Sequence, residues 1–313
     1  MSNKELYRNI CAQKKDVPLF LQHWWLDAVC NDWDAAIAKK GEQVTGIWPY
    51  QLEKKSGMAL LRNPKLTPYL GPHIFYPNDI KESNLDSFEY DTLAELTPQL
   101  PTAKVWNLAL QPGLKQAGIF KNNGTQLQVQ QTFLIDLQQG EQMLFANMKE
   151  NMRRNIRAAE KEITISNSPE YLPDLYNFQK NTLEGKGKKQ FYNLADLQKI
   201  IEACFANNAA ALWVAKKEDK VQAIVWHGWD EQNSYYLMGG QNPAADSYRA
   251  MSALLWYAIK EAKKRGNTAF DMEGSMDAGV ERFFRGFAGN RTLYMILKKN
   301  ESFLWKLKEL LGR

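Results

Sequence analysis

The sequence has few of the residues that build disulfide frameworks and metal sites. Of its 313 residues, only three are cysteine and three are histidine. The cysteines form no CxxC pair and the histidines show no HxxE, HxH or HExxH spacing; they are Cys11, Cys30, Cys204, His23, His73 and His227. We therefore predict neither a disulfide scaffold nor a metal site, and a reducing compartment is the simpler expectation.

Long apolar runs are also missing. The longest, Met251–Ile259, is interrupted by Ser252 and is far shorter than the roughly 20 residues of a membrane span. The N-terminal stretch MSNKELYRNICAQKKD is polar and lacks the apolar core of a signal peptide. We therefore expect a cytoplasmic protein. Its amphipathic tail, Ser302–Arg313, packs on its own domain or makes a peripheral contact with the inner face of the membrane.

The remaining composition is that of a soluble globular protein. Apolar residues make up 44%, charged residues 24% and aromatic residues 12% of the chain. A length of 313 residues is too great for one small core and suits two domains. The net charge of +5 is compatible with a polyanionic ligand but does not require one.

Hydrophobic periodicity predicts a similar succession of elements in both halves. In the first half, helix, strands, helix and strands are expected at residues 19–29, 35–40, 43–50, 58–63, 85–96, 104–110 and 128–137. In the second half, helix, strand, two helices, three strands, helix and strand are expected at residues 139–162, 163–168, 169–187, 192–208, 212–217, 221–229, 234–240, 250–266 and 268–275. We predict two α/β domains, residues 1–140 and 141–313, and an ancient duplication as a hypothesis for their similarity.

The stretch from Leu212 to Gly289 carries the main functional signal. The strand Ser234–Gly240 passes through the polar turn QNPAADSYR into the long helix Ala250–Gly266. Such a junction gathers backbone N–H groups at the positive end of the helix dipole, where a phosphate binds favourably. The next strand, TAFDMEGS, leads into VERFFRGFAGN, which we interpret as a Gly- and Arg-rich loop. This order of elements suggests a ligand that carries a nucleotide.

The same stretch resembles the acyltransferase domain of the GNAT superfamily. The resemblance lies in the strand that ends at Gly239–Gly240, the helix ALLWYAIKEAKKRG and the strand FDMEG. A closer resemblance is to the Fem-like branch, on the basic helix MKENMRRNIRAAEK, the aspartate strand FDMEGSM and the basic aromatic loop ERFFRGFAG. Since it covers most of residues 15–300, the resemblance implies two tandem GNAT-like domains, each a mixed central sheet flanked by helices.

The resemblance also implies N-acyl transfer. An acyl or aminoacyl group would pass from a co-substrate, acyl-CoA or aminoacyl-tRNA, to an amine acceptor, with no permanently bound cofactor and no metal. Fem enzymes use aminoacyl-tRNA and a peptidoglycan precursor, so tRNA and a cell-wall precursor are candidate partners beside a small-molecule amine. The phosphate turn departs from the GNAT pattern, because its glycine positions fall on or near Ala250 and Ser252. A degenerate, non-catalytic binding protein is therefore an alternative.

The candidate donor-binding residues surround this turn. They are Gly239, Gly240, Gln241, Ser247, Tyr248, Arg249, Ala250 and Ser252. The first three form either a bulged strand end that contacts a thioester or acceptor amide, or a plain turn before Asn242–Pro243. Ser247 suits an N-cap. Arg249 either grips a phosphate or stays solvated.

The candidate catalytic residues are Arg285, Asp271 and Glu273. The resemblance places Arg285 at the position of a lysine in a Phe-Lys pair, proposed in the Fem family to stabilise charge during aminoacyl transfer. Asp271 and Glu273 alternate on one expected strand and so share a face. One of them would act as general base if burial raised its pKa. The alternative is a structural ion pair between these carboxylates and Arg282 or Arg285.

A basic stripe is predicted on the helix that follows the first domain. Arg153, Arg157 and Lys161 recur every fourth residue, and Arg154 lies beside them. Such a stripe would follow an RNA backbone or lipid headgroups. A solvated helix face is the commoner outcome of the same pattern.

Overall fold

The computed structural model describes residues 2–55, 57–121, 124–245, 249–274 and 276–301. The chain divides into two compact units. The N-terminal unit runs to Gln130 and is resumed at Leu293, and the C-terminal unit is Gln131–Thr292. The sequence analysis divides the chain once, near residue 140. In the structure the last strand returns to the first unit.

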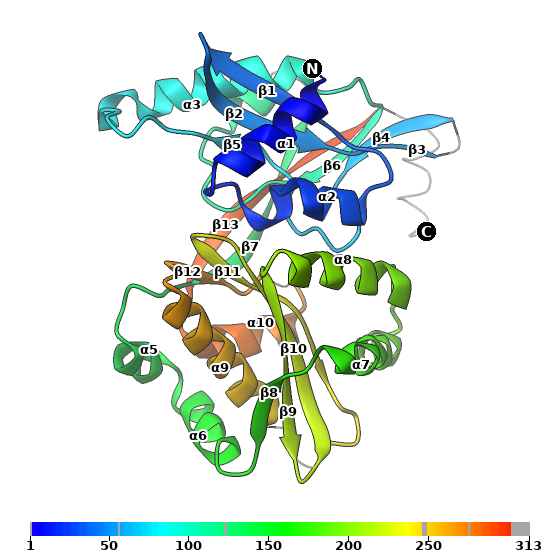
Figure 1. Cartoon of the computed structure of the whole chain (residues 1–313), viewed down its shortest axis with the longest axis vertical. Coiled ribbons are helices and arrows are strands. Elements are labelled where there is room, and N and C mark those ends of the chain that lie inside the picture. The colour runs from blue at the N-terminus through cyan, green and yellow to red at the C-terminus, as the bar shows by residue number, and fades with distance from the viewer. Residues whose placement is uncertain (1, 56, 122–123, 246–248, 275, 302–313) are drawn as a thin grey trace. The chain divides into compact units, whose positions relative to one another are not determined.

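The N-terminal unit is built of short helices and antiparallel hairpins (Figure 1). Its helices are α1 (Asn3–Gln13), α2 (His23–Val29), α3 (Glu82–Leu96) and α4 (Gly118–Lys121), with 3-10 turns at Leu19–Leu21 and Thr97–Gln99. Its strands are β1 (Asp34–Lys40), β2 (Gln43–Tyr50), β3 (Leu52–Lys55), β4 (Met58–Arg62), β5 (His73–Ile74) and β6 (Val105–Ala109). One sheet has the order β1-β2-β5; in the other, β3-β4-β6 is extended by β13 (Asn290–Asn300).

The β1–β2 hairpin is covered on both faces, as Figure 1 shows. Successive side chains of a strand point to opposite faces. Ala35 and Ile37 accordingly belong to a core cluster with α1, whereas Ala36 and Ala38 belong to one with α3. Because both faces of β1 are buried, its sequence contains a continuous apolar run rather than an alternation of apolar and polar residues.

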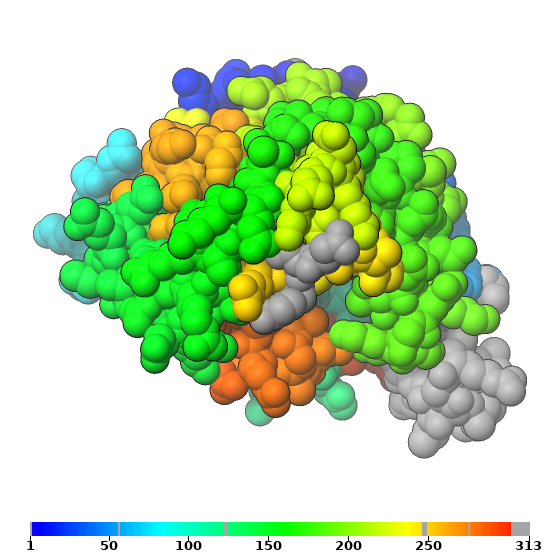
Figure 2. Space-filling view, turned by 90° about the horizontal axis from the view of Figure 1, so that it is seen from below, coloured from blue at the N-terminus to red at the C-terminus, as the bar shows by residue number. Residues whose placement is uncertain are grey.

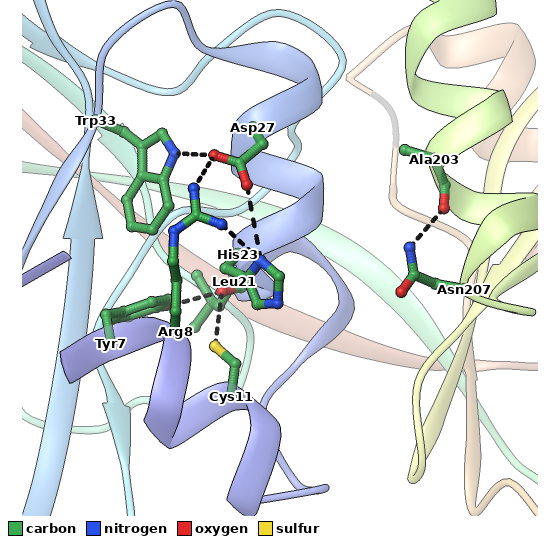
Figure 3. A network of polar contacts seen from close by, with 9 residues as sticks. All are labelled: Tyr7, Arg8, Cys11, Leu21, His23, Asp27, Trp33, Ala203 and Asn207. Carbon is green, nitrogen blue, oxygen red and sulfur yellow. Dashed lines mark hydrogen bonds and ion pairs between the residues drawn. The ribbon is translucent and has the colours of Figure 1, made fainter. Parts of the chain in front are cut away.

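Periodicity does not predict helix α1, although the sequence contains its start signal. Ser2 and Glu5 form a capping box, in which each side chain accepts the other's backbone N–H. Farther along α1, Arg8 donates to Oδ1 of Asp27 at 2.7 Å, and Nε1 of Trp33 donates to the same oxygen at 3.0 Å (Figure 3). This network joins α1, α2 and the start of β1.

The C-terminal unit is a mixed sheet flanked by helices (Figure 1). Its helices are α5 (Glu141–Asn147), α6 (Glu150–Ala159), α7 (Leu172–Gly185), α8 (Leu194–Ala206), α9 (Ala250–Arg265) and α10 (Ala278–Phe284), with 3-10 turns at Pro169–Tyr171 and Arg285–Phe287. Its strands are β7 (Gln126–Asp136), β8 (Thr164–Asn167), β9 (Ala210–Lys217), β10 (Lys220–Trp229), β11 (Asn233–Gln241) and β12 (Ala269–Asp271). They lie in the order β7-β12-β11-β10-β9-β8. The β11–β12 pair is parallel.

Two expected elements of this unit are wrong. The single helix expected at residues 139–162 is broken between α5 and α6, where the backbone N–H of Lys149 leaves the helical pattern and donates to the carbonyl of Gly286 at 3.0 Å. The loop expected at Val280–Asn290 is mostly helical. Its helix α10 begins because the Asp277 side chain accepts the N–H groups of Gly279 and Val280.

Candidate active site

The parallel strands β11 and β12 part in the middle of the C-terminal sheet. Their ladder runs from Asn233↔Ala269 to Tyr235↔Asp271. Beyond that pair β11 continues to Gln241, whereas β12 ends. The two strands therefore stop pairing beyond Tyr235 and Asp271, and we call this point the strand gap. Beyond this point the backbone groups of β11 have no ladder partner on β12, so they need other partners or a ligand.

A bulge shapes the β11 side of the strand gap. The β10–β11 register shifts between Trp226↔Met238 and His227↔Tyr236, so Leu237 is an extra residue. Bulges re-aim side chains and are common beside active sites. Residues Gly239–Gln241, expected from the sequence to form either a bulged strand end or a plain turn, instead pair regularly with β10.

The two glycines of β11 allow close packing on either side of the strand. A Cβ on Gly239 would lie 2.0 Å from the hydroxyl oxygen of Tyr236, and one on Gly240 would lie 2.8 Å from Cβ of Phe178 on α7. The Gly239 carbonyl also accepts a hydrogen bond from Nε2 of Gln179, again on α7. Tyr236 and Gln179 are site residues that the sequence analysis does not single out.

The β12 side of the strand gap carries the carboxylates Asp271 and Glu273. The expectation that they share one strand face is wrong, because β12 ends at Asp271 and Glu273 has a left-handed φ of +52°. Oδ1 of Asp271 accepts from the Thr132 hydroxyl at 2.5 Å and from the Glu273 N–H at 2.8 Å. Asp271 therefore stabilises the turn that orients the Glu273 side chain.

Glu273 has the environment of a tuned acid–base group. Its Oε1 is shielded from solvent and has no hydrogen-bond partner among the described residues. Burial, and secondly the charge of Asp271, raise the pKa of Glu273 well above 4.5. Burial, and secondly the charge of Glu273, also raise the pKa of Tyr236. Tyr236 is therefore protonated at neutral pH.

The raised pKa of Glu273 predicts a specific pH dependence of stability. As pH rises above the ordinary glutamate pKa of 4.5, the unfolded chain releases this proton while the folded chain retains it, so the folded state loses stability until the raised pKa is passed. Glu273→Gln removes this loss. Urea unfolding from pH 5 to pH 8 should therefore show a stability advantage of the variant over wild type that grows with pH. Glu231→Gln, at an exposed carboxyl between β10 and β11, should show no such trend.

A cationic pocket of about 390 Å³ lies in the same unit, where α6, α9 and α10 meet. Figure 2 shows this side, with α6 in green, the start of α9 in gold and α10 in orange. The lining residues are Lys149, Asn151, Met152, Asn155, Ser252, Gly279, Arg282, Phe283, Arg285 and Gly286. Three are cations and none is a carboxylate. The pocket also receives the first turns of α6 and α9, so it suits an anion such as a phosphate.

The pocket and the carboxylates are linked through aromatic packing. Tyr236 packs edge-on against Phe284 with ring centroids 5.4 Å apart, and Phe284 adjoins the pocket residue Phe283. Arg285 forms an ion pair with Glu281 at 3.9 Å and keeps 47% of its side chain exposed. Its guanidinium therefore remains accessible to a ligand in the pocket.

The structure brings only part of the predicted donor-binding set to this pocket. Ser252 lines it, and the buried Ala250 is the first residue of α9. Arg249 is the N-cap residue of α9, with its backbone in the α region. The predictions for Ser247 and Tyr248 fall outside the described residues, as does that for the tail after Glu301. The pocket residues Lys149, Asn151 and Asn155 were not predicted.

The predicted basic stripe is largely occupied by intramolecular contacts. Arg153 donates to the carbonyl of Ala146, and the Arg157 guanidinium lies 5.2 Å from the ring centroid of Phe145. Both contacts hold α6 against α5. Lys161 lies beyond the end of α6, so it does not continue the helical spacing, whereas Arg154 is exposed.

Other kinds of site receive no support from the part of the chain that the structure describes. In that part, no three His, Cys, Asp or Glu side chains gather as metal ligands would. Nor does any helix there combine the length and the apolar character that crossing a membrane requires.

Comparison with known proteins identifies an acetyltransferase-type domain within the C-terminal unit. Residues 146–285, which include the strand gap and nearly all of the pocket, match the acetyltransferase (GNAT) domain family. No curated protein matches the chain.

Solved structures extend the similarity beyond this domain. FemX is similar over 99% of this chain and 98% of its own, with a TM-score of 0.68 and 13% identity. L-PGS from Bacillus licheniformis is similar over 99% and 97%, with a TM-score of 0.54 and 15% identity. A tandem GNAT protein from the clavulanic acid biosynthesis pathway is similar over 87% and 83%, with a TM-score of 0.51 and 8% identity. Residues 146–285 therefore form a GNAT-type domain, and the chain is similar in fold to FemX and to a tandem GNAT protein.

Proposed function

We propose that the C-terminal unit transfers an acyl group from acyl-CoA to a primary amine. The observation that carries the proposal is Glu273, which has a raised pKa and one shielded oxygen, lies at the strand gap and is connected to the cationic pocket through Tyr236, Phe284 and Phe283. A base in the gap and an anion site beside it are the requirements of amine acylation by a phosphate-bearing donor.

The proposed chemistry uses the residues on both sides of the gap. Glu273 takes a proton from the acceptor ammonium, and the amine nitrogen attacks the donor carbonyl. Backbone N–H groups of β11 beyond its pairing with β12 stabilise the oxyanion that forms. When the carbon–sulfur bond breaks, the Tyr236 hydroxyl donates a proton to the departing thiolate and recovers one from the nitrogen of the intermediate, which leaves a neutral amide. Glu273 then releases its proton to solvent. Holding the donor and the acceptor in this geometry supplies much of the rate enhancement.

The donor phosphates are assigned to the cationic pocket. Lys149, Arg282 and Arg285 supply charge there, and Ser252 marks the first turn of α9. The glycines of the usual phosphate turn are replaced by Ala250 and Ser252, but both side chains are small. Backbone approach therefore stays open. The acceptor is an amine, either of a small molecule or of a cell-wall precursor.

The test is donor binding followed by thermal unfolding. Acetyl-CoA, a longer acyl-CoA or free CoA should raise the melting temperature, because a ligand of the folded state stabilises it by about 2.7 kcal/mol at a hundredfold excess over Kd. Arg282→Ala or Arg285→Ala should weaken binding about 10- to 100-fold, the cost of a lost charge-assisted hydrogen bond. Lys199→Ala removes an exposed charge on α8 and should change nothing. A wild-type protein that no CoA species stabilises would contradict the acyl-CoA donor.

A second candidate donor is aminoacyl-tRNA, with a cell-wall precursor as acceptor. The observation in its favour is that Arg154 is exposed on α6, the helix whose first turn lines the pocket. Alanyl-tRNA is the probe. Its binding should weaken with salt, and Arg154→Ala should reduce the salt slope by about 0.7–0.9 if this arginine contacts a phosphate. Salt-independent binding would exclude this donor.

A further inference from the structure

The strand gap has separate supports on its two sides. On the β11 side, α7 packs against Gly240, and Gln179 of α7 donates to the Gly239 carbonyl. Tyr192, in the segment between α7 and α8, donates to Sδ of Met238 at 3.4 Å. On the β12 side, Glu273 precedes α10, which carries the pocket residue Arg282 and is followed directly by Arg285. These two supports belong to segments far apart in the sequence.

A single ion pair connects the two supports among the described residues. Helix α7 ends at Gly185, and Lys186 follows as its C-cap. Nζ of Lys186 lies 2.9 Å from Oδ2 of Asp277, with side-chain exposures of 39% and 28%. The other oxygen of Asp277 accepts the N–H groups of Gly279 and Val280 and so caps α10. Asp277 therefore uses one oxygen to start α10 and the other to hold α7.

We propose that the Lys186–Asp277 ion pair positions the catalytic groups by tying together the two sides of the strand gap. Without the pair, the end of α7 and α10 lose their direct polar link, and the distance between β11 and Glu273 is less tightly fixed. Lys186 and Asp277 are positioning residues, since they act through Glu273 and the pocket arginines. The proposal rests on the proposed function for its kinetic consequence.

A positioning role and a merely stabilising role predict different effects of losing the pair on the catalytic rate and on the free energy of unfolding. An exposed ion pair contributes little to the free energy of unfolding. A small displacement of reacting groups, by contrast, costs up to about 100-fold in rate. The hydrogen bond from Lys186 is the main cause that lowers the pKa of Asp277, so the pair is expected to persist at neutral pH. Loss of the ion pair should lower the rate of acyl transfer and scarcely change the melting temperature.

The experiment is a double-mutant cycle with Lys186→Met and Asp277→Asn. Asparagine also caps helices well, so Asp277→Asn removes the ion pair and retains the start of α10. Each variant should lower kcat/KM for acyl transfer about 10- to 100-fold through kcat, with the melting temperature within about 2 °C of wild type. The double variant should be no slower than either single one. Lys186→Arg should restore the rate.

Lys180→Met is the matched control, because it breaks the Lys180–Glu184 pair at 4.0 Å on the same helix without touching α10. It should leave kcat/KM at the wild-type value. Multiplicative losses in the cycle, or equal losses in Lys180→Met, would overturn the proposal.

Amide hydrogen exchange provides a readout that needs no turnover. Both cycle variants should speed exchange in residues 186–192 and in α10 together. If wild type transfers no acyl group, the proposed function fails. The exchange result alone then decides whether the Lys186–Asp277 ion pair joins the two segments. Exchange that rises in only one of the two segments would show that the pair does not join them.

Discussion

Replacing Glu273 with glutamine is expected to lower kcat for acyl transfer by about 10²- to 10⁴-fold, the usual contribution of a positioned general base. Glutamine keeps the size of the side chain and cannot accept the proton. Donor binding should be unchanged, because Glu273 does not line the cationic pocket. The measurement is steady-state transfer to an amine whose own pKa lies well above the assay range, so that it is bound as the ammonium, with the CoA-induced melting shift as the check on binding.

The pH dependence of the same reaction provides an independent test. The wild-type rate should rise with pH through the raised pKa of Glu273, because only the carboxylate accepts a proton. Asp271 is a secondary cause of that raised pKa. Asp271→Asn should therefore move the profile toward lower pH, with a loss of rate from the weakened turn. Full activity of Glu273→Gln would eliminate the carboxylate as base and favour an amine that is deprotonated in solution.

Stability and activity respond to pH in opposite directions because both depend on this one proton. The folded state is favoured where Glu273 is protonated, and transfer requires its ionised form. A shielded oxygen without a hydrogen-bond partner is costly for folding. The Glu273→Gln variant is thus expected to be slower and, above neutral pH, more stable. This is the usual exchange between stability and function at an active site.

Periodic segments of this fold were predictable from the sequence, and weakly patterned ones were not. Strands β9, β10 and β11 and helix α9 lie close to their expected ranges, because long apolar patterns fix both type and face. Helix α1 was missed, since it buries only Tyr7 and Ile10. Strand β3 was missed too, because its sequence LEKK is charged and suits an exposed edge.

The candidate site was predictable in its location and less so in its geometry. The strand–turn–helix order pointed to the start of α9, and FDMEG drew attention to Asp271 and Glu273. That β12 ends early is a tertiary property, because it depends on where β11 and β12 stop pairing. Asn151 and Asn155 resemble any polar residues of a solvated helix, so nothing in the sequence distinguishes them as pocket-lining.

Gly274 is the residue of the site whose role is least visible in the sequence. It has a φ of +60° directly after Glu273, and a Cβ there would lie 2.1 Å from the carbonyl oxygen of Gln131 and 2.9 Å from Cα of Thr132. Both obstacles are backbone, and Thr132 also holds Asp271. Glycine is therefore required for two reasons, its left-handed conformation and its close approach to β7. The sequence shows only a glycine after a glutamate.

Gly274→Ala is accordingly expected to destabilise the protein by about 2–5 kcal/mol, from strained backbone and overpacking together. It should also lower the transfer rate about 100-fold, because the turn that aims Glu273 must shift. Gly266→Ala is the matched control: its φ is +89°, yet nothing lies within 4 Å of the added Cβ. Gly266→Ala should lower the free energy of unfolding by only about 1–2 kcal/mol, the cost of the left-handed conformation alone. It should leave the rate of acyl transfer unchanged. Urea unfolding and acyl-transfer assays of the two variants measure the difference. Equal stability losses would mean that β7 yields to the methyl group, and the orientation of Glu273 would then have to come from Asp271 alone.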